Sequence, residues 1–298
     1  LSGWALFGAV GFAHQHGYSY FSHYYGISGM FIIAPAFLIP LYRLTHNYQL
    51  GTLADLLVFR YRSSLIGKMT AIISLTASIP LLASQITSVN EIFNLFSAQK
   101  NSNNLFACLF TLGITLIGIG FSFLTPTQQK ESNASLILCA ATIGLIKMIC
   151  IAAICLYLYF FILNHEESLQ QWLAQTPQAL EMLYAPLTQN NWRTLIFVSF
   201  ASVIAMPHVY HMIFSQHTQQ RSLVQISWTL PLLILIAAFL PPFALWSALK
   251  MKIFANPDYM LVHIALSKQS HLLTLLILLA SISATGAICT VAATNLRH

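Results

Sequence analysis

Long apolar runs separated by short polar connections dominate the pattern of this chain. A helix needs roughly 20 mostly apolar residues to cross the hydrocarbon core of a bilayer. Seven runs reach that length, and a half-length apolar segment precedes them at residues 1–13. The pattern therefore predicts seven transmembrane helices and one partial helix. The seven predicted spans are 19–42, 66–96, 105–124, 134–162, 192–215, 224–249 and 271–296.

The connections between these spans carry most of the polar residues. Residues 43–63 contain a short helical pattern at Leu53–Arg60, which predicts an interfacial helix, and residues 125–133 predict a polar loop. Residues 163–191 and 250–270 predict longer extramembrane connections, the first with an amphipathic helix lying on the membrane. If 43–63 is cytoplasmic, seven Lys and Arg residues lie on that side and five on the other, which favours this orientation.

Composition agrees with a bilayer as the main solvent. Hydrophobic residues make up 57% of the 298 positions and charged residues only 7%, whereas a soluble domain carries about 25% charged residues. The net charge of +6 is scattered without a basic run, so nucleic acid is not expected as a partner. The five cysteines lie in apolar runs without metal-ligand spacing. The chain is therefore predicted to be an all-α membrane protein with the lipid bilayer around it.

The first segment is rich in glycine, with Gly3, Gly8 and Gly11 in nine residues. Each glycine weakens a helix by about 1 kcal/mol relative to alanine. Two interpretations follow. An unwound helix would free backbone carbonyls for an ion or a solute, whereas small residues also allow close helix packing.

Four further groups place polar atoms at membrane depth, where burial is costly and function is the first hypothesis. They are Lys147 in the fourth full span, Gln85 in the second, the run Met206–His211 in the fifth, and Ser283 in the last. Pro207 predicts a kink. His208 and His211 do not predict a metal site, because no carboxylate or thiolate stands near them in the sequence. Structural alternatives stay open for all four groups, because polar side chains also form hydrogen bonds between helices. The sequence contains no recognisable catalytic arrangement.

Several stretches resemble the sodium/solute symporter family. They are Ser2–Ala9, Gly51–Ser63 and Ile79–Gln85. A subgroup is closer: the transporter-like membrane input domain of sensor histidine kinases, which Leu6–Gly11, Leu145–Met148 and Met206–His211 resemble in the same order along the chain.

The resemblance implies the inverted-repeat transporter fold, with discontinuous helices and a binding site near the midplane. It also implies that residues 1–298 form a single transmembrane domain running from the middle of core helix one to core helix eight. Ser2, Gly3, Trp4 and Gln85 would then contact the solute. The Leu1 and Ala280 carbonyls and the Ser283 hydroxyl would bind sodium, and Lys147, Pro207, His208 and His211 would form a coupling or structural network.

Three departures from the family pattern bear on these expectations. Ala284 stands at the second hydroxyl position of the sodium site, which removes one ligand, and Ile143 and His208 replace a glutamate and an arginine of the subgroup. The first expectation for function is an input domain in the bacterial inner membrane. It would bind a small solute, an amino acid or a carboxylate, with transport of that solute left open, and would signal to a cytoplasmic kinase and its response regulator. The alternatives are a sodium-coupled solute symporter and an inactive remnant of one. No cofactor is expected besides a sodium ion.

Overall fold

A computed structural model describes residues 3–97, 109, 113, 126–165, 167–184, 191–210, 213–214 and 220–295. Every regular element in these ranges is a helix. The elements are η1 Gly3–Ala5, α1 Gly8–His16, η2 Gly17–Tyr20, α2 Phe21–Ile32, α3 Leu38–Asn47, α4 Leu53–Tyr61, α5 Ser64–Ser97, α7 Pro126–Leu158, the π-helix η3 Tyr159–Leu163, α8 Leu169–Gln175, α9 Pro177–Glu181, α10 Asn191–Ala205, α11 Pro207–Tyr210, α12 Gln220–Ala238, α13 Leu240–Lys250, η5 Pro257–Tyr259, α14 Met260–Lys268 and α15 His271–Asn295.

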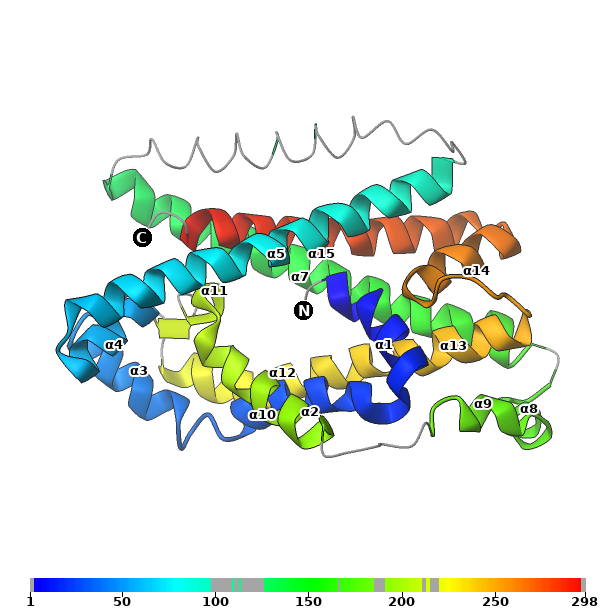
Figure 1. Cartoon of the computed structure of the whole chain (residues 1–298). Helices are drawn as coiled ribbons and strands as arrows, with labels where there is room; N and C mark the ends of the chain where they lie inside the picture. Colours follow the sequence, from blue (N-terminus) through cyan, green and yellow to red (C-terminus); the bar gives the residue numbers. More distant parts are fainter. Residues whose placement is uncertain are drawn as a thin grey trace.

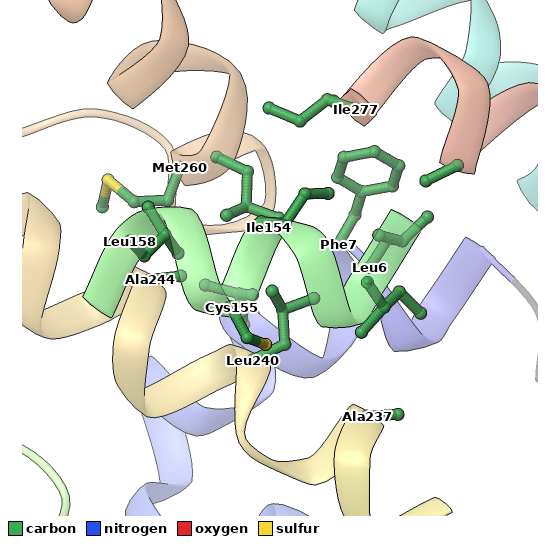
Figure 2. Packing of buried hydrophobic residues seen from close by; sticks show 14 of the residues in the cluster. Leu6, Phe7, Ile154, Cys155, Leu158, Ala237, Leu240, Ala244, Met260 and Ile277 are labelled. Atoms are coloured by element: carbon green, nitrogen blue, oxygen red, sulfur yellow. The ribbon is translucent and has the colours of Figure 1, made fainter. Parts of the chain in front are cut away.

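The long helices form a bundle rather than a string of separate hairpins. α15 packs along α7 and also contacts α5, while α2 packs between α10 and α12 (Figure 1). The larger core cluster joins α1, α2, α7, α13, α14 and α15. Leu6 and Phe7 belong to this cluster and lie beside α7, so this early part of the chain is inside the bundle (Figure 2).

Two helices are long and apolar enough to cross a bilayer, judged by length and composition: Ala141–Leu163 and Leu223–Lys250. Shorter apolar helices run over Ser64–Pro80, Trp192–Ala205 and His271–Ser283 within the described residues. The helical class is therefore confirmed. The run 105–124 falls almost wholly outside the described residues.

Two expectations about continuity are wrong. The run 19–42 is not one helix, because α2 ends at Ile32 and α3 begins at Leu38. Pro35 lies in the break, where it has no N–H to donate and also disfavours helical geometry in the residue before it. Residues 125–133 are not a loop, since α7 already begins at Pro126. Proline suits the first position of a helix, and the glutamines, lysine and glutamate after it are good helix formers.

Other breaks coincide with proline. α10 ends at Ala205 and α11 restarts at Pro207, which confirms the predicted kink. The run 224–249 is divided at Phe239 into α12 and α13, directly before Pro241 and Pro242. The orphaned carbonyl of Ala238, four residues before Pro242, accepts a hydrogen bond from the Tyr20 hydroxyl at 2.8 Å.

The described part of the connection 163–191 is held against the bundle by direct bonds. It contains two short helices, α8 and α9, in place of one amphipathic helix. The Trp246 indole N–H donates to the Ala179 carbonyl at 2.9 Å, and the Tyr18 N–H donates to the Leu183 carbonyl at 2.9 Å. Trp172, Ala179 and Leu183 are buried. These three apolar side chains therefore pack against the rest of the protein and are not available to contact a membrane surface.

The helix predicted at Leu53–Arg60 is confirmed as α4, and its start is a capping box. The Asp55 N–H donates to the Thr52 hydroxyl at 3.1 Å, and the Thr52 N–H donates to the Asp55 carboxylate at 3.0 Å. Both residues belong to the Gly51–Ser63 stretch that carries the family resemblance. In this structure, Thr52 and Asp55 therefore stabilise the first turn of α4.

Replacing Thr52 by alanine is expected to destabilise α4 by about 1 kcal/mol, because one end of the capping box is lost. Hydrogen exchange of the α4 amides should accelerate accordingly. Thr76→Ala is the matched control, since the Thr76 hydroxyl bonds only to the carbonyls of Ile72 and Ile73 in its own helix. Equal exchange in α4 for Thr52→Ala and the wild type would contradict the capping role.

Candidate functional site

The candidate site is built on the interrupted helix at the start of the chain. In a continuous α-helix the Val10 N–H would bond to the Leu6 carbonyl, but here it bonds to Phe7 at 3.0 Å. The Gly11 N–H also bonds to the Phe7 carbonyl, at 3.2 Å, so the ladder restarts there and passes over Leu6. The glycine-rich start therefore shows an interrupted helix, and Gly8 and Gly11 also allow close packing against Trp4 and Asp258.

The interruption lies in the middle of the bundle. η1 contacts α15, and α1 contacts α13, η2 and η5. Leu6 and Ala9 are fully buried, and Phe7 is only 3% exposed. A substrate or ion at this position would therefore meet backbone from η1 and side chains from the helices packed around it.

Trp4 is the largest side chain of η1 and is partly buried. Its ring centroid lies 4.4 Å from that of His23 in an edge-to-face arrangement, 5.9 Å from Tyr24 and 6.4 Å from Phe12. Gly8 makes room for the indole, because a Cβ at this position would lie 2.5 Å from the Trp4 Cδ1. Trp4 is thus held in an aromatic cluster formed by η1, α1 and α2.

Two polar groups adjoin this cluster. The His23 Nδ1 lies 3.0 Å from the Ser199 Oγ, which links α2 to α10. The Tyr24 hydroxyl is buried and has no hydrogen-bond partner among the described residues. A buried unpaired hydroxyl costs about 1–3 kcal/mol, so this atom marks a position where a water or a solute atom would be stabilising.

The predicted sodium ligands on α15 lie within one turn of each other. Ala280 is fully buried, Ser283 is 8% exposed, and the Ser283 hydroxyl donates to the Ala280 carbonyl at 2.8 Å. While its proton forms this hydrogen bond, the hydroxyl oxygen still has lone pairs that can bind a cation. Leu1, the third predicted ligand, lies outside the described residues. The described residues contain no group of three or more His, Cys, Asp or Glu side chains that would suit a transition metal.

Lys147 is buried within α7, at 3% exposure. It lies four residues before Ile151 and seven before Ile154, so it shares the core-facing stripe of the helix. α15 packs along α7, and α12 and α13 also contact it. The amine therefore faces the bundle interior, as expected for an ionisable group at membrane depth.

The remaining predicted site residues are placed only by their backbone or not at all. Gln85 belongs to α5, and Pro207 and His208 open α11, but their side chains are outside the described part of the structure. Ser2 and His211 lie outside the described residues altogether. Of the predicted substrate contacts, the structure positions Gly3 and Trp4 at the interrupted helix.

Sequence reasoning did not select His23, Tyr24 or Ser199 as site residues. They lie in apolar runs, where the hydropathy pattern does not distinguish a functional aromatic or hydroxyl residue from a structural one. Only the packing of α2 on α10 brings the His23 imidazole to Ser199 and to the Trp4 ring. The one available signal was the histidine itself, which the sequence places near an interface as a pH-sensitive group.

A separate charged region adjoins α1 from outside. Burial, followed by the negative charges of Glu91 and Asp258, raises the pKa of Tyr259. The Tyr259 ring lies 6.0 Å from Phe7, and an Asp258 carboxylate oxygen occupies the space where a Cβ of Gly11 would be. The connection 250–270 is therefore packed directly on the interrupted helix.

Comparisons of the chain with protein-family models, curated proteins and solved structures return no match.

Proposed function

We propose that this chain is a multi-pass membrane domain that binds a small solute at the interrupted helix η1–α1. In this proposal it acts as the input domain of a sensor histidine kinase and transmits solute occupancy to a cytoplasmic kinase. The observation that carries the proposal is the restart of the helix ladder at Phe7, with Trp4 beside it in the bundle interior. An interrupted helix offers backbone groups to a solute at a depth where water is scarce.

The link to a kinase rests on the resemblance of Leu6–Gly11, Leu145–Met148 and Met206–His211 to the input domains of that subgroup. The interior position of Lys147 supports it, because a buried amine at membrane depth responds to rearrangement of the helices around it. Solute binding would bias the bundle between two arrangements, and the kinase would read the difference.

The solute-binding step is tested with the purified full chain in nanodiscs and a panel of radiolabelled amino acids and small carboxylates. We expect at least one of them to bind, and Trp4→Ala to weaken that binding by roughly ten-fold or more, the equivalent of about 1.4 kcal/mol. Trp228→Ala is the matched control, because Trp228 is 70% exposed on α12. Equal binding by both variants would place the solute elsewhere.

The signalling step needs the complete reading frame that contains this chain. We expect a dimerisation histidine and an ATP-binding domain downstream, and solute-dependent autophosphorylation that Trp4→Ala abolishes. A reading frame that continues with further membrane helices and no kinase would contradict the proposal.

The second candidate function is a sodium-coupled solute symporter. It is favoured by the buried pair Ala280 and Ser283 on α15, in a helix that η1 contacts. Uptake of the same labelled solutes into proteoliposomes, with sodium or with potassium, separates the two functions. Sodium-dependent uptake that is lost in Ser283→Ala supports the symporter, and uptake indifferent to sodium counts against it.

A further inference from the structure

We infer that His23 is a positioning residue for the Trp4 indole, and that it holds this ring in a proton-dependent way. The starting observation is a chain of contacts across three elements. The His23 ring lies 4.4 Å from the Trp4 ring, and its Nδ1 lies 3.0 Å from the Ser199 Oγ. η1, α2 and α10 are therefore joined through one imidazole.

Two glycines make this arrangement possible. At Gly8 a Cβ would lie 2.5 Å from Trp4 Cδ1, so the indole keeps its position only because that residue has no side chain. At Gly26, three residues after His23, a Cβ would lie 2.5 Å from the Ile196 carbonyl oxygen and 2.6 Å from the Ser199 Cβ. The close approach of α10 to α2 at Gly26 brings the Ser199 hydroxyl within reach of His23.

Protonation changes what the imidazole can do in this position. A neutral ring has one donor and one acceptor nitrogen, whereas the imidazolium donates from both. Nδ1 would then donate to Ser199, and a positive charge would lie beside the indole, whose plane is inclined by 64° to the imidazole. Acidification is therefore expected to change the contact between His23 and Trp4.

The surrounding elements offer few competing charges. Among the described side chains, the ionisable groups on them are Tyr18, Tyr20, Tyr24 and Tyr25 on η2 and α2, His14 and His16 at the far end of α1, Arg193 near the start of α10, and His271 at the start of α15. Neither α12 nor α15 contributes a carboxylate within its described side chains, and the carboxylate that reaches α1 is Asp258, at Gly11. No carboxylate is therefore present among the described side chains of α2, α10 and α12 to pair with an imidazolium at position 23, and the Trp4 ring lies 4.4 Å from it, centroid to centroid.

The test uses tryptophan fluorescence of the full chain in nanodiscs, without any solute, as the pH is lowered from 8 to 3. The contribution of Trp4 is the difference between the wild type and Trp4→Phe. We expect this contribution to change in a single step, because the edge-to-face histidine gains a charge beside the indole. In His23→Gln, which keeps a hydrogen-bonding group but cannot titrate in this range, the step should be lost completely.

His16→Gln is the matched control, since His16 stacks on Phe12 at 4.5 Å and not on Trp4. The step should remain in this variant. Ser199→Ala provides a second, independent variant: it removes the partner of Nδ1, so the midpoint of the step should move. A step that persists in His23→Gln, or a midpoint unchanged in Ser199→Ala, overturns the inference.

The significance of this contact rests on the proposed function, because Trp4 is the proposed solute contact. The two failures are nevertheless distinguishable. Fluorescence without solute reports the His23–Trp4 contact alone, whereas the radiolabel assay at a fixed pH reports solute binding. If both hold, the solute affinity of the wild type should vary with pH across the fluorescence step, and that of His23→Gln should not.

Discussion

Replacing Gly26 by alanine is expected to destabilise the protein by about 3 kcal/mol, because α2 and α10 cannot remain at their present separation. An added Cβ would lie 2.5 Å from the Ile196 carbonyl oxygen and 3.0 Å from the Phe200 backbone nitrogen. Backbone atoms within a helix cannot rotate away as a side chain can. The helices would have to separate, which weakens the packing of Met30, Phe31 and Val203 in the smaller core cluster.

Unfolding can be followed through the thiols of Cys150 and Cys155, which are both buried and free. A thiol-reactive dye should label Gly26→Ala at a clearly lower temperature than the wild type. Gly11→Ala is the informative control. Its Cβ would meet the carboxylate of Asp258, the end of an exposed side chain that can turn outward. A loss of stability in Gly11→Ala as large as that in Gly26→Ala would show that the backbone contact at Gly26 is not the cause.

Replacing Tyr20 by phenylalanine is expected to cost about 1–3 kcal/mol, because it leaves the Ala238 carbonyl without a donor. Proline at position 242 has no N–H for this carbonyl, and the Tyr20 hydroxyl supplies the missing hydrogen bond from a fully buried position. The tyrosine on α2 therefore stabilises the break between α12 and α13.

A double-mutant cycle isolates this effect. Pro242→Ala restores an N–H four residues after Ala238, so Tyr20→Phe should cost clearly less in that background than in the wild type. Tyr25→Phe is the control, since Tyr25 is 62% exposed. The measurement is unfolding in detergent with the same thiol label. Additive effects of Tyr20→Phe and Pro242→Ala would contradict the assigned pairing.

The sequence predicted the positions of helices better than their interruptions. α5 and α15 begin and end close to the predicted spans, since a long apolar run specifies a helix at membrane depth by length alone. The breaks at Pro35 and Phe239 lie inside such runs and leave hydropathy unchanged. Both had a local signal in proline, but proline is also tolerated within helices, as Pro80 and Pro231 are here.

Only those features of the site that depend on neighbouring residues in the sequence could be predicted. The glycines at 3, 8 and 11 predicted a weak helix, and the interruption at Leu6 confirms that prediction. The contact between His23 and Ser199 joins residues 176 positions apart, so no local pattern reveals it. The predicted pair Ala280 and Ser283 lies together because three residues are less than one helical turn. The roles proposed for Lys147, Gln85 and His208 stay predictions.

The hydrogen bond from the Lys250 amine to the Leu163 carbonyl, at 3.0 Å, joins the C-terminal ends of the two most apolar helices. These stretches, Ala141–Leu163 and Leu223–Lys250, are the two among the described residues that are long and apolar enough to cross a bilayer. The bond fixes their C-terminal ends to one another, so sliding of one stretch along the other would break it. The division at Phe239 lies within the second stretch, so this tie holds α13 directly and α12 only through the break between them.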